Sequence, residues 1–414
     1  MDNSNPLGRL RAMTEPQAIF DSYSRAVSAR IDAILAGDPP FALHPQSQNF
    51  ADFIAPARAL SVGGKRSRAR FFLAGFQAGS GLTLDQIETL VGAVTNNSLA
   101  DALVGAGAAL ELYQLSALVH DDIIDAAATR RGVPTAHTTY AKRHAAAHWL
   151  GDAREYGDKI GILLGDYLLS LAAYTWEIAL AHCSEIEAHA ATNARLLFHS
   201  MTGEVAFGQF TDAHNEFLPL LTPSPATEDP EQSADPGIAN ALSVLYHKAA
   251  RYSVTVPTEL GAELGCGFHG DGELLASRQE SRTETLAQLE AITRPVGEAF
   301  QLRDDTIGVF GLESATGKPA GGDIIEGKRT ALLALTRQRA NGEELALIDS
   351  LLGKQITAEQ LESFQGLIRS TGAYDAHETM ITTRENAARE LISGSDLQLD
   401  LLRTIVEQLA GRWS

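Results

Sequence analysis

Apolar residues recur along most of this chain at intervals of three and four positions, the spacing that gathers them on one face of an α-helix. The stretch Leu99–Asp125 shows the pattern best, with an apolar face and a flanking stripe formed by Leu99, Leu103, Ala106, Leu110 and Ala117, and by Leu112, Leu115 and Val119. Similar spacing predicts further helices within Glu15–Leu35, Thr192–Phe210, Ile238–Leu264, Thr283–Gly308 and Thr330–Leu352.

No convincing series of alternating strands and no Gly-x-Gly-x-x-Gly turn after a strand is found, so we predict an all-α chain. Residues 1–50 are polar with prolines near both ends, and we expect them to form an N-terminal extension. Five prolines among acidic and small residues make 215–237 a loop or mobile insertion. Neither segment looks like a boundary between independent domains, so one catalytic domain over residues 51–414 is the simplest organisation.

Composition narrows the class of protein. Of the 414 residues, 44% are hydrophobic and 21% are charged, as in ordinary globular enzymes. The net charge of −19 argues against a nucleic-acid partner, which requires a dense basic surface. Cys183 and Cys266 form neither a disulfide framework nor a zinc motif, and the N-terminus lacks a signal-peptide core. The apolar stretch Ile160–Ala181 contains Asp166 and Glu177, so we expect a buried helix, no membrane span and a cytoplasmic protein.

An acidic cluster with basic residues behind it, LVHDDIIDAAATRRG, ends the best predicted helix. Asp121 and Asp125 are four residues apart and project from the same helical face, with Asp122 about 100° away. A solvated helix end is the alternative, but aliphatic residues flank the aspartates, and buried carboxylates require a compensating cation. Paired carboxylates suit Mg²⁺ ions that also bind phosphate oxygens.

A second cluster lies about 180 residues further on, in FQLRDDTIGVFG followed by TGKPAGGDIIEGKR. It contains Asp304 and Asp305, but the position one turn on is Gly308 rather than an acid, so this half supplies fewer ligands. Two such clusters facing one cavity would hold a diphosphate through Mg²⁺. Alone, the Asp-Asp pair is a weak signal.

Cations are concentrated in the segment SVGGKRSRARF, with Gly63 and Gly64 ahead of four basic residues, and again at Arg130 and Arg131. A solvated charged face is the alternative for either run alone. Glycines let a backbone approach phosphate, while Lys and Arg supply charge and paired donors. The P-loop spacing is missing, so we interpret the first segment as a metal-free anion pocket for a second substrate.

Together these motifs, GGKRSR, LVHDDIID with TRRGVPT, FQLRDD and TGKPAGGDIIEGKRT, resemble the trans-polyprenyl diphosphate synthases, the family of farnesyl and geranylgeranyl diphosphate synthases. The resemblance covers roughly Ser61–Leu335. It implies an all-α bundle of ten or more helices around a central cavity, the isoprenoid synthase fold. It also implies a homodimer and a Mg²⁺-dependent transferase that joins isopentenyl diphosphate to an allylic diphosphate.

The resemblance also implies a role for each matching residue. Isopentenyl diphosphate would be bound by Lys65, Arg68, Gln114 and Arg131. The allylic diphosphate would be bound by Arg130, Lys248, Gln301, Lys318 and Lys328. Three Mg²⁺ ions would be held by Asp121, Asp125 and Asp304, with Asp122 and Asp305 beside them. The departures from the family pattern are Ala249, where a threonine is usual, and Gly308.

The implied chemistry needs no protein nucleophile. The metal ions and Arg130, Lys248 and Lys318 would stabilise a departing diphosphate, an allylic carbocation would form, and the isopentenyl double bond would attack it. The released diphosphate would take the proton. His120 and His137 are interpreted as structural residues.

Product length is expected to follow from the floor of the cavity. Ser116 and Ala117, five and four residues before Asp121, are expected on the same helical face one turn below it. Both are small where short-chain members of the family commonly carry an aromatic residue. We therefore expect geranylgeranyl diphosphate or a somewhat longer product, with Tyr113 as the next stop. Phe at position 116 or 117 should shorten it.

Three alternatives remain. A class I terpene cyclase has an Asp-rich helical site but no use for Lys65, Arg68 and Arg131. A non-catalytic subunit that regulates another synthase would be expected to lose its aspartates or arginines, which this chain keeps. Ala249 and Gly308 also leave open an altered allylic specificity.

Overall fold

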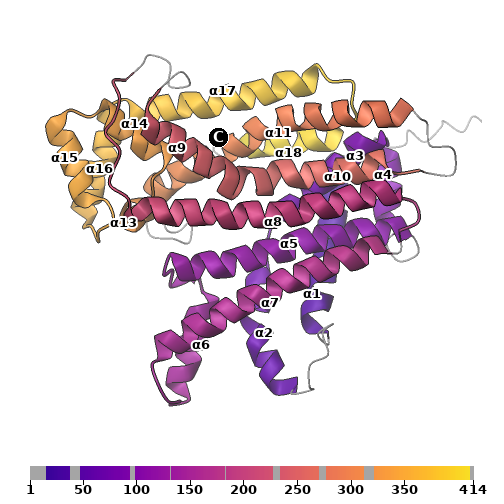
Figure 1. Cartoon of the computed structure of the whole chain (residues 1–414), viewed down its shortest axis with the longest axis horizontal. Coiled ribbons are helices and arrows are strands. Elements are labelled where there is room, and N and C mark those ends of the chain that lie inside the picture. The colour runs from indigo at the N-terminus through magenta and orange to yellow at the C-terminus, as the bar shows by residue number, and fades with distance from the viewer. Residues whose placement is uncertain are drawn as a thin grey trace, which may run out of the picture.

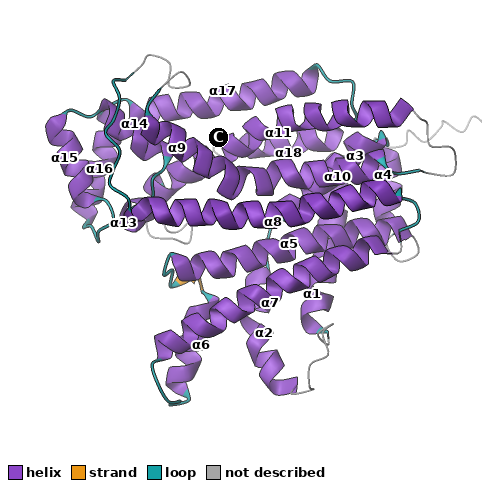
Figure 2. Ribbon diagram, viewed as in Figure 1, coloured by secondary structure: helices purple, strands orange, loops and turns teal. Residues whose placement is uncertain are grey.

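The computed structural model describes residues 15–37, 47–93, 98–130, 132–181, 183–226, 234–269, 277–311 and 321–410. Within these ranges the chain is almost entirely helical, and its only strands are the two-residue β1 (Thr129–Arg130) and β2 (Val133–Pro134), which pair antiparallel (Figure 2). The all-α prediction is therefore confirmed.

The helices of the N-terminal half are α1 (Pro16–Ala36), α2 (Ser47–Ser61), α3 (Ser67–Ser80), α4 (Leu84–Gly92), α5 (Ser98–Ile124), α6 (Ala136–Ala146), α7 (Ala153–Ala181) and α8 (Ala188–Phe217). Those of the C-terminal half are α9 (Pro236–Leu245), the π-helix η2 (Tyr246–Thr255), α10 (Val256–Cys266), α11 (Ser277–Phe310), α13 (Gly322–Glu326), α14 (Ala331–Arg339), α15 (Gly342–Leu351), α16 (Ala358–Ser370), α17 (Ala373–Ser393) and α18 (Asp400–Ala410). Figure 1 shows the long helices α5, α7, α8, α11 and α17 running along the longest axis.

Two helices predicted from periodicity are divided in the structure. The stretch Ile238–Leu264 becomes α9, η2 and α10, because a π-helical segment interrupts the α-helical hydrogen bonds. The stretch Thr330–Leu352 becomes α14 and α15 because the Asn341 side chain accepts hydrogen bonds from the amides of Glu343 and Glu344, which starts a new helix.

Helix α5 lies in the middle of the protein and packs against α7. Its segment Leu99–Ile124 is, among the described residues, the one helix long and apolar enough to cross a membrane, with mean hydropathy 1.5. However, 83% of that apolar window is buried inside the protein, as expected of a core helix. The stretch Ile160–Ala181, considered from the sequence, belongs to α7, which has one buried side and one exposed side.

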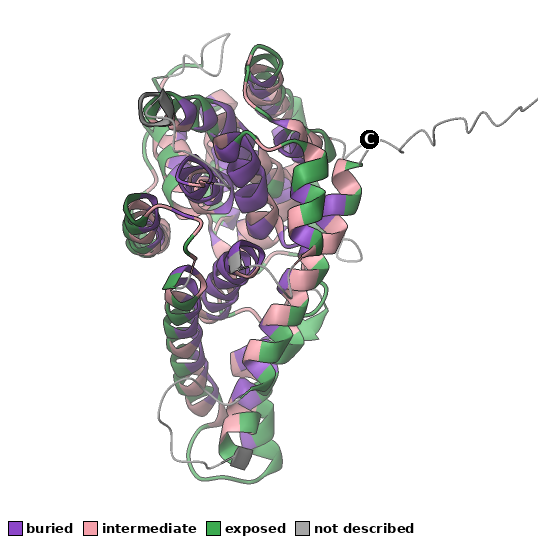
Figure 3. Cartoon of the chain, turned by 90° about the vertical axis from the view of Figure 1, so that its right-hand side faces the viewer, coloured by how far each residue is buried: buried purple, intermediate pink, exposed green. Residues whose placement is uncertain are grey.

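Two clusters of buried hydrophobic residues form the core, which Figure 3 shows as the purple interior. The larger one includes α5 and also α1, where Phe20, Tyr23 and Val27 are buried and the Tyr23 hydroxyl donates to the Leu103 carbonyl at 2.7 Å. Residues 16–36 thus share a core with the helices that follow residue 50. The smaller cluster joins α9, α11, α14, α16 and α17.

Close packing of α3 on α10 depends on glycine. A Cβ atom on Gly75 would overlap the backbone of Thr258, and one on Gly261 would overlap the backbone of Phe72. The two helix backbones can therefore approach more closely than side chains would allow. This contact fixes the start of α3, which carries Arg68, against η2.

Part of the proline-rich segment is held against the helices. Asp235 caps α9, accepting from the Gly237 and Ile238 amides, and also accepts from the Ser224 amide at 2.7 Å. Arg337 of α14 donates to the Leu221 carbonyl at 2.8 Å. Residues 218–226 lack helix and strand, as predicted for a loop, whereas 215–217 belong to α8 and 236–237 belong to α9. Residues 227–233 lie outside the described residues.

Candidate active site

The C-terminal end of α5 carries the first acidic cluster. After the helix ends, Ala126 adopts a left-handed conformation with φ of 50°, and the chain reverses into the β1–β2 hairpin. This reversal returns Arg130 to the aspartates. Its Nε donates to Asp122 Oδ1 at 2.7 Å and its Nη2 donates to Asp121 Oδ2 at 3.1 Å. Asp122 is fully buried, so its carboxylate pairs with Arg130 inside the protein, whereas Asp121 is partly exposed.

The π-helix η2 brings Lys248 to the same cluster. Its Nζ lies 3.8 Å from Asp121 Oδ1 and forms a closer ion pair with Asp212 of α8. The approach depends on Gly208 of α8, where a Cβ atom would overlap the Lys248 backbone. Burial acts to lower the pKa of Lys248, but Asp212 and Asp121 raise it above its ordinary value, so the side chain stays charged.

Lys328, on the loop after α13, reaches the other aspartate of the first cluster. Its Nζ lies 3.2 Å from Asp125 Oδ2 and 2.7 Å from Glu326 Oε2. Burial acts to lower the pKa of Lys328, but Asp323, Asp125 and Glu326 raise it well above its ordinary value. The structure thus brings Arg130, Lys248 and Lys328 to one acidic cluster from three separate segments.

The second acidic cluster lies on α11, in the turn Gln301–Asp305. Asp304 is exposed, whereas Asp305 is buried with 9% of its surface exposed. Burial, followed by the charges of Asp323 and Asp304, raises the pKa of Asp305 well above its ordinary value. Asp305 Oδ2 is buried and has no hydrogen-bond partner within the described part of the chain.

A separate group of polar residues contains Arg68 and Gln114. Arg68 Nη2 donates to Ser253 Oγ at 2.6 Å, and its guanidinium lies 4.4 Å from the centre of the Tyr252 ring. The Tyr252 hydroxyl donates to Gln114 Oε1 at 2.6 Å. Arg68 Nε is buried without a hydrogen-bond partner among the described residues.

The other two arginines of the basic segment have structural partners. Arg66 donates to Ser28 Oγ at 2.9 Å, and Arg70 donates to Ser24 Oγ at 3.1 Å, which fastens α3 to α1. Lys65 is exposed at the loop before α3. Arg131 and Lys318, predicted to bind diphosphate, lie outside the described residues.

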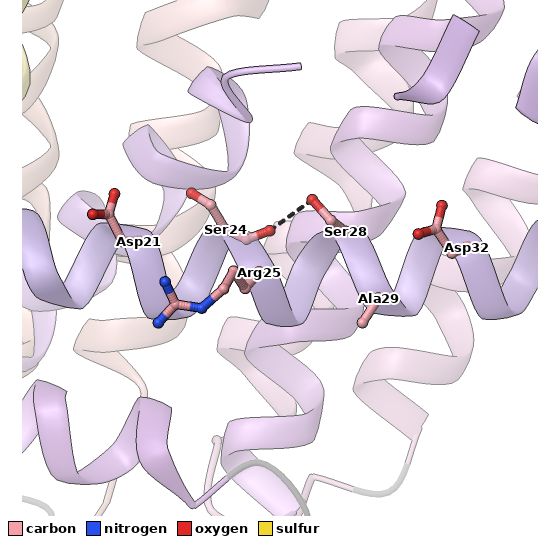
Figure 4. Close-up of a pocket in the computed structure, with 6 residues that line it drawn as sticks. All are labelled: Asp21, Ser24, Arg25, Ser28, Ala29 and Asp32. Atoms are coloured by element: carbon pink, nitrogen blue, oxygen red, sulfur yellow. Dashed lines mark hydrogen bonds between the residues drawn. The ribbon is translucent and has the colours of Figure 1, made fainter. Parts of the chain in front are cut away.

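The serines that receive these arginines lie along a shallow depression on α1, shown in Figure 4 and lined by Asp21, Ser24, Arg25, Ser28, Ala29 and Asp32. All six residues belong to one helix. The predicted site residues are on other elements, so the depression is apart from both acidic clusters.

Half-exposed residues form a stripe on the mostly buried α5. Gln114 is followed three and four residues later by Ala117 and Leu118, and these are followed four and three residues later by Asp121. Such a stripe on a core helix marks the side that faces open space rather than packed neighbours. The predicted floor residue Ala117 therefore lies on the same accessible side as the aspartate.

Ser116 does not share that side. It is buried, and its hydroxyl donates to the Gly165 carbonyl of α7 at 2.8 Å. The prediction that Ser116 and Asp121 occupy one helical face is wrong, because five residues correspond to about 500° and turn Ser116 away. Tyr113 is buried against Phe198 and Tyr252, with ring centres 6.5 and 6.0 Å away.

The histidines have neighbours suited to structural roles. His120 Nε2 lies 3.3 Å from the Ile162 carbonyl and 3.4 Å from Asp166 Oδ1, packed over Gly165 of α7. His137 Nδ1 lies 3.2 Å from Thr135 Oγ1 at the start of α6.

Sequence reasoning missed several acids that the structure adds to the site. Asp212 and Glu216 are one turn apart on α8, so the spacing argument used for Asp121 and Asp125 would have found them. Burial, then Asp212 and Asp125, raise the pKa of Glu216 to about 7. Within the described ranges, however, no three His, Cys, Asp or Glu side chains already lie close enough to hold a metal ion.

Comparisons with known proteins identify the family of this chain. Residues 53–367 match the polyprenyl synthetase family. The short chain isoprenyl diphosphate synthase of Methanothermobacter thermautotrophicus is 26% identical over 356 residues, which cover 85% of this chain and 86% of that protein. The nonaprenyl diphosphate synthase of Mycobacterium tuberculosis is 25% identical over 376 residues, 90% of this chain and 88% of that protein.

Among solved structures, the geranylgeranyl pyrophosphate synthase of Corynebacterium glutamicum, crystallised with isoprenyl diphosphate and magnesium, superposes with a TM-score of 0.71. It is 30% identical, and the match covers 95% of this chain and 96% of that one. The solved structure shares the fold of this chain, and the names of the relatives cover products that range from short to nonaprenyl chains.

Proposed function

This chain belongs to the polyprenyl synthetase family and is a prenyl diphosphate synthase, and we propose that it joins isopentenyl diphosphate to an allylic diphosphate in a Mg²⁺-dependent reaction. The observation that carries the proposal is a pair of cationic groups along the accessible side of α5. The first group is Arg68, which is joined through Tyr252 to Gln114 of α5. The second group is Lys248 and Lys328, which lie beside the aspartates at the C-terminal end of the same helix.

The residues present fit magnesium. Mg²⁺ favours one or two carboxylates together with waters and substrate phosphates, so a site without three preassembled ligands suits it. Asp121 and Asp125 would hold metal at the first cluster, and Asp304 would hold it at the second, with Asp305 Oδ2 as an unsatisfied acceptor nearby. We propose that three Mg²⁺ ions bind at these two clusters together with the diphosphate. Bound metal supplies charge neutralisation of the diphosphate leaving group.

In the proposed reaction, the allylic C–O bond breaks, and Arg130, Lys248 and Lys328 hold the departing diphosphate in place. Arg68 and Lys65 hold isopentenyl diphosphate so that its double bond faces the allylic carbon, and the new C–C bond forms there. The isopentenyl unit then loses a proton, which the released diphosphate accepts. The apolar side chains beside Ala117 would exclude water from the cation.

The proposed product is geranylgeranyl diphosphate or a somewhat longer chain. Ala117 offers no obstruction on the accessible side of α5, which supports growth beyond the farnesyl length. Tyr113 lies further along the helix and closes the space with Phe198 and Tyr252. We therefore assign the end of the cavity to these aromatic rings.

We also propose a homodimer formed through α7 and α8. Large apolar side chains lie exposed on both helices, including Leu163 and Ile178 on α7 and Leu196 and Phe207 on α8, with exposed fractions of 55%, 50%, 66% and 69%. The two helices are joined by Arg195 Nε, which donates to Glu177 Oε2 at 2.9 Å. Extended apolar surface of this kind is typical of an interface between copies of a chain.

The rival functions are less well supported. A terpene cyclase needs one diphosphate site, whereas the separate Arg68 group provides for a second. A regulatory subunit would not need Asp121, Asp125, Lys248 and Lys328 to be kept together. All relatives named above are synthases.

The test is incubation of the pure protein with isopentenyl diphosphate, each allylic starter from dimethylallyl to geranylgeranyl diphosphate, and Mg²⁺, followed by chromatography of the products. We expect longer prenyl diphosphates, and we expect EDTA or Asp121→Ala to reduce turnover by at least about 100-fold. Cyclic hydrocarbons from a single diphosphate would support the cyclase instead. Undiminished turnover in EDTA would refute the metal-dependent mechanism.

A further inference from the structure

The space beside Gly308 on α11 is taken by another part of the chain. Gly308 lies one turn after Asp304, where a side chain would complete the second acidic cluster. A Cβ atom built on Gly308 would overlap the carboxylate of Asp323, which lies in the first turn of α13. The acid that is missing from position 308 in sequence is thus present there in space.

The short helix α13 holds Asp323 in a fixed relation to Lys328. Gly321 and Gly327 flank the helix with φ of 75° and 79°, left-handed conformations that glycine adopts without strain. The Asp323 carbonyl accepts from the Gly327 amide at 3.1 Å and from the Lys328 amide at 3.0 Å. The backbone that presents the Asp323 carboxylate to α11 therefore also presents Lys328 to α5.

Asp323 lies between the two acidic clusters. Its carboxylate occupies the space beside Gly308, one turn after Asp304 on α11. Its carbonyl accepts from the amide of Lys328, whose Nζ lies 3.2 Å from Asp125 Oδ2 of the first cluster. Beside it, Asp305 carries a buried oxygen without a hydrogen-bond partner within the described part of the chain.

We propose that Asp323 supplies the carboxylate that position 308 lacks, so that Asp304 and Asp323, from two different helices, hold a divalent cation at the second cluster. The inference rests on the proposed function, because the cation would bind together with a diphosphate. Two carboxylates, phosphate oxygens and waters satisfy the octahedral preference of Mg²⁺. The second cluster, which lacks an acid at position 308, is then completed by Asp323, 19 residues after Asp304 in the sequence.

The test measures metal binding without turnover. Mn²⁺ is titrated into the protein in the presence of inorganic diphosphate, and free Mn²⁺ is followed by electron paramagnetic resonance. Asp323→Asn keeps the shape but removes the charge, and we expect it to lose one bound ion or to weaken Mn²⁺ binding by at least about tenfold. Glu362→Gln, which removes an exposed carboxylate on α16, is the matched control and should leave the titration unchanged.

A relocated carboxylate makes the test sharper. In the double variant Gly308→Asp with Asp323→Gly, the new side chain grows into the space that Asp323 leaves, and Mn²⁺ binding should return to within about threefold of the original. Gly308→Ala alone should weaken binding as Asp323→Asn does, because its methyl group displaces the carboxylate. Circular dichroism checks that each variant is folded.

The outcomes separate the two proposals. If the unaltered protein binds Mn²⁺ with diphosphate and elongates prenyl chains, but Asp323→Asn does both equally well, only the role of Asp323 is overturned. If the unaltered protein neither binds Mn²⁺ nor makes prenyl products, the proposed function fails as well. Weak binding in Asp323→Asn without recovery in the double variant would also overturn the assignment, because position 308 would then not be equivalent.

Discussion

Lys328 Nζ lies 3.2 Å from Asp125 Oδ2, which joins the loop after α13 to the end of α5. Arg130 and Lys248 pair with Asp121 in the same manner. The cations assigned to the allylic diphosphate are therefore paired with the carboxylates assigned to Mg²⁺. When a magnesium diphosphate binds, the aspartates would pair with the metal and the lysines and arginine would pair with phosphate. No buried charge would be left uncompensated by this exchange of partners.

This exchange predicts the behaviour of Lys328→Met. The variant loses a charged contact to the allylic diphosphate, so the KM for the allylic starter should rise by roughly 10- to 100-fold, as expected for a charge-assisted hydrogen bond. The KM for isopentenyl diphosphate should change little. Steady-state kinetics with each substrate varied in turn measures both constants. Lys354→Met, an exposed lysine on the loop after α15, is the control. An equal rise in both KM values would contradict the assignment.

The direction of two neighbouring side chains on α5 predicts different effects on product length. Ala117 is on the accessible side, so Ala117→Phe should block the growing chain and shorten the product by one or more isoprene units. Ser116 contacts α7, so Ser116→Phe should crowd Gly165 and lower the melting temperature rather than reset the product. Thin-layer or liquid chromatography of dephosphorylated products, together with thermal unfolding, distinguishes the two. Unchanged product from a folded Ala117→Phe would remove Ala117 from the floor.

Local signals in the sequence were sufficient for the first half of the site. The i to i+4 spacing of Asp121 and Asp125 and the apolar periodicity before them are properties of one helix, so they can be read without the fold. Lys65 and Arg68 were separated from their basic neighbours only through the family resemblance. The structure shows the physical difference, because Arg66 and Arg70 are bound to serines of α1.

The rest of the site depends on contacts between distant segments. The place of Asp323 over Gly308 is set by the fold of α13, and no spacing rule connects the two residues. The π-helix that carries Lys248 has the same apolar periodicity as an ordinary helix at this length, so the sequence predicts one continuous helix where the structure has α9, η2 and α10. Ser116 points away from Asp121 because five residues of an α-helix correspond to about 500°.

The exposed apolar sides of α7 and α8 predict a dimer that a single charge can break. Ile178→Arg or Leu196→Arg places an uncompensated charge in the proposed interface, so the sedimentation coefficient or light-scattering mass should fall from that of a dimer to that of a monomer. Leu150→Arg is the matched control, because Leu150 is 98% exposed on the loop before α7 and lies outside that surface. A protein of monomeric mass before any substitution would contradict the proposal.

The buried His377 of α17 predicts how stability depends on pH. Its surface is 0% exposed, its Nδ1 lies 3.3 Å from Thr306 Oγ1 of the second acidic segment, and its Nε2 has no partner among the described residues. Burial, then the charges of Arg384 and Arg303, lower the pKa of His377 from 6.5 to about 3. The folded protein therefore keeps this imidazole neutral at pH values where the unfolded chain protonates it.

Because the pKa of His377 is lowered in the folded state, acid destabilises the protein. The contribution of His377 to stability is fully present above pH 6.5 and is lost as the pH falls from 6.5 towards 3. Relative to His377→Asn, which cannot protonate, the unaltered protein should lose about 1.4 kcal/mol of unfolding free energy for each pH unit below 6.5. Urea unfolding at several pH values between 5 and 8 measures the difference, with His214→Asn on the exposed side of α8 as control. Parallel stability curves for the unaltered protein and His377→Asn would show that the imidazole is already able to take up a proton in the folded state.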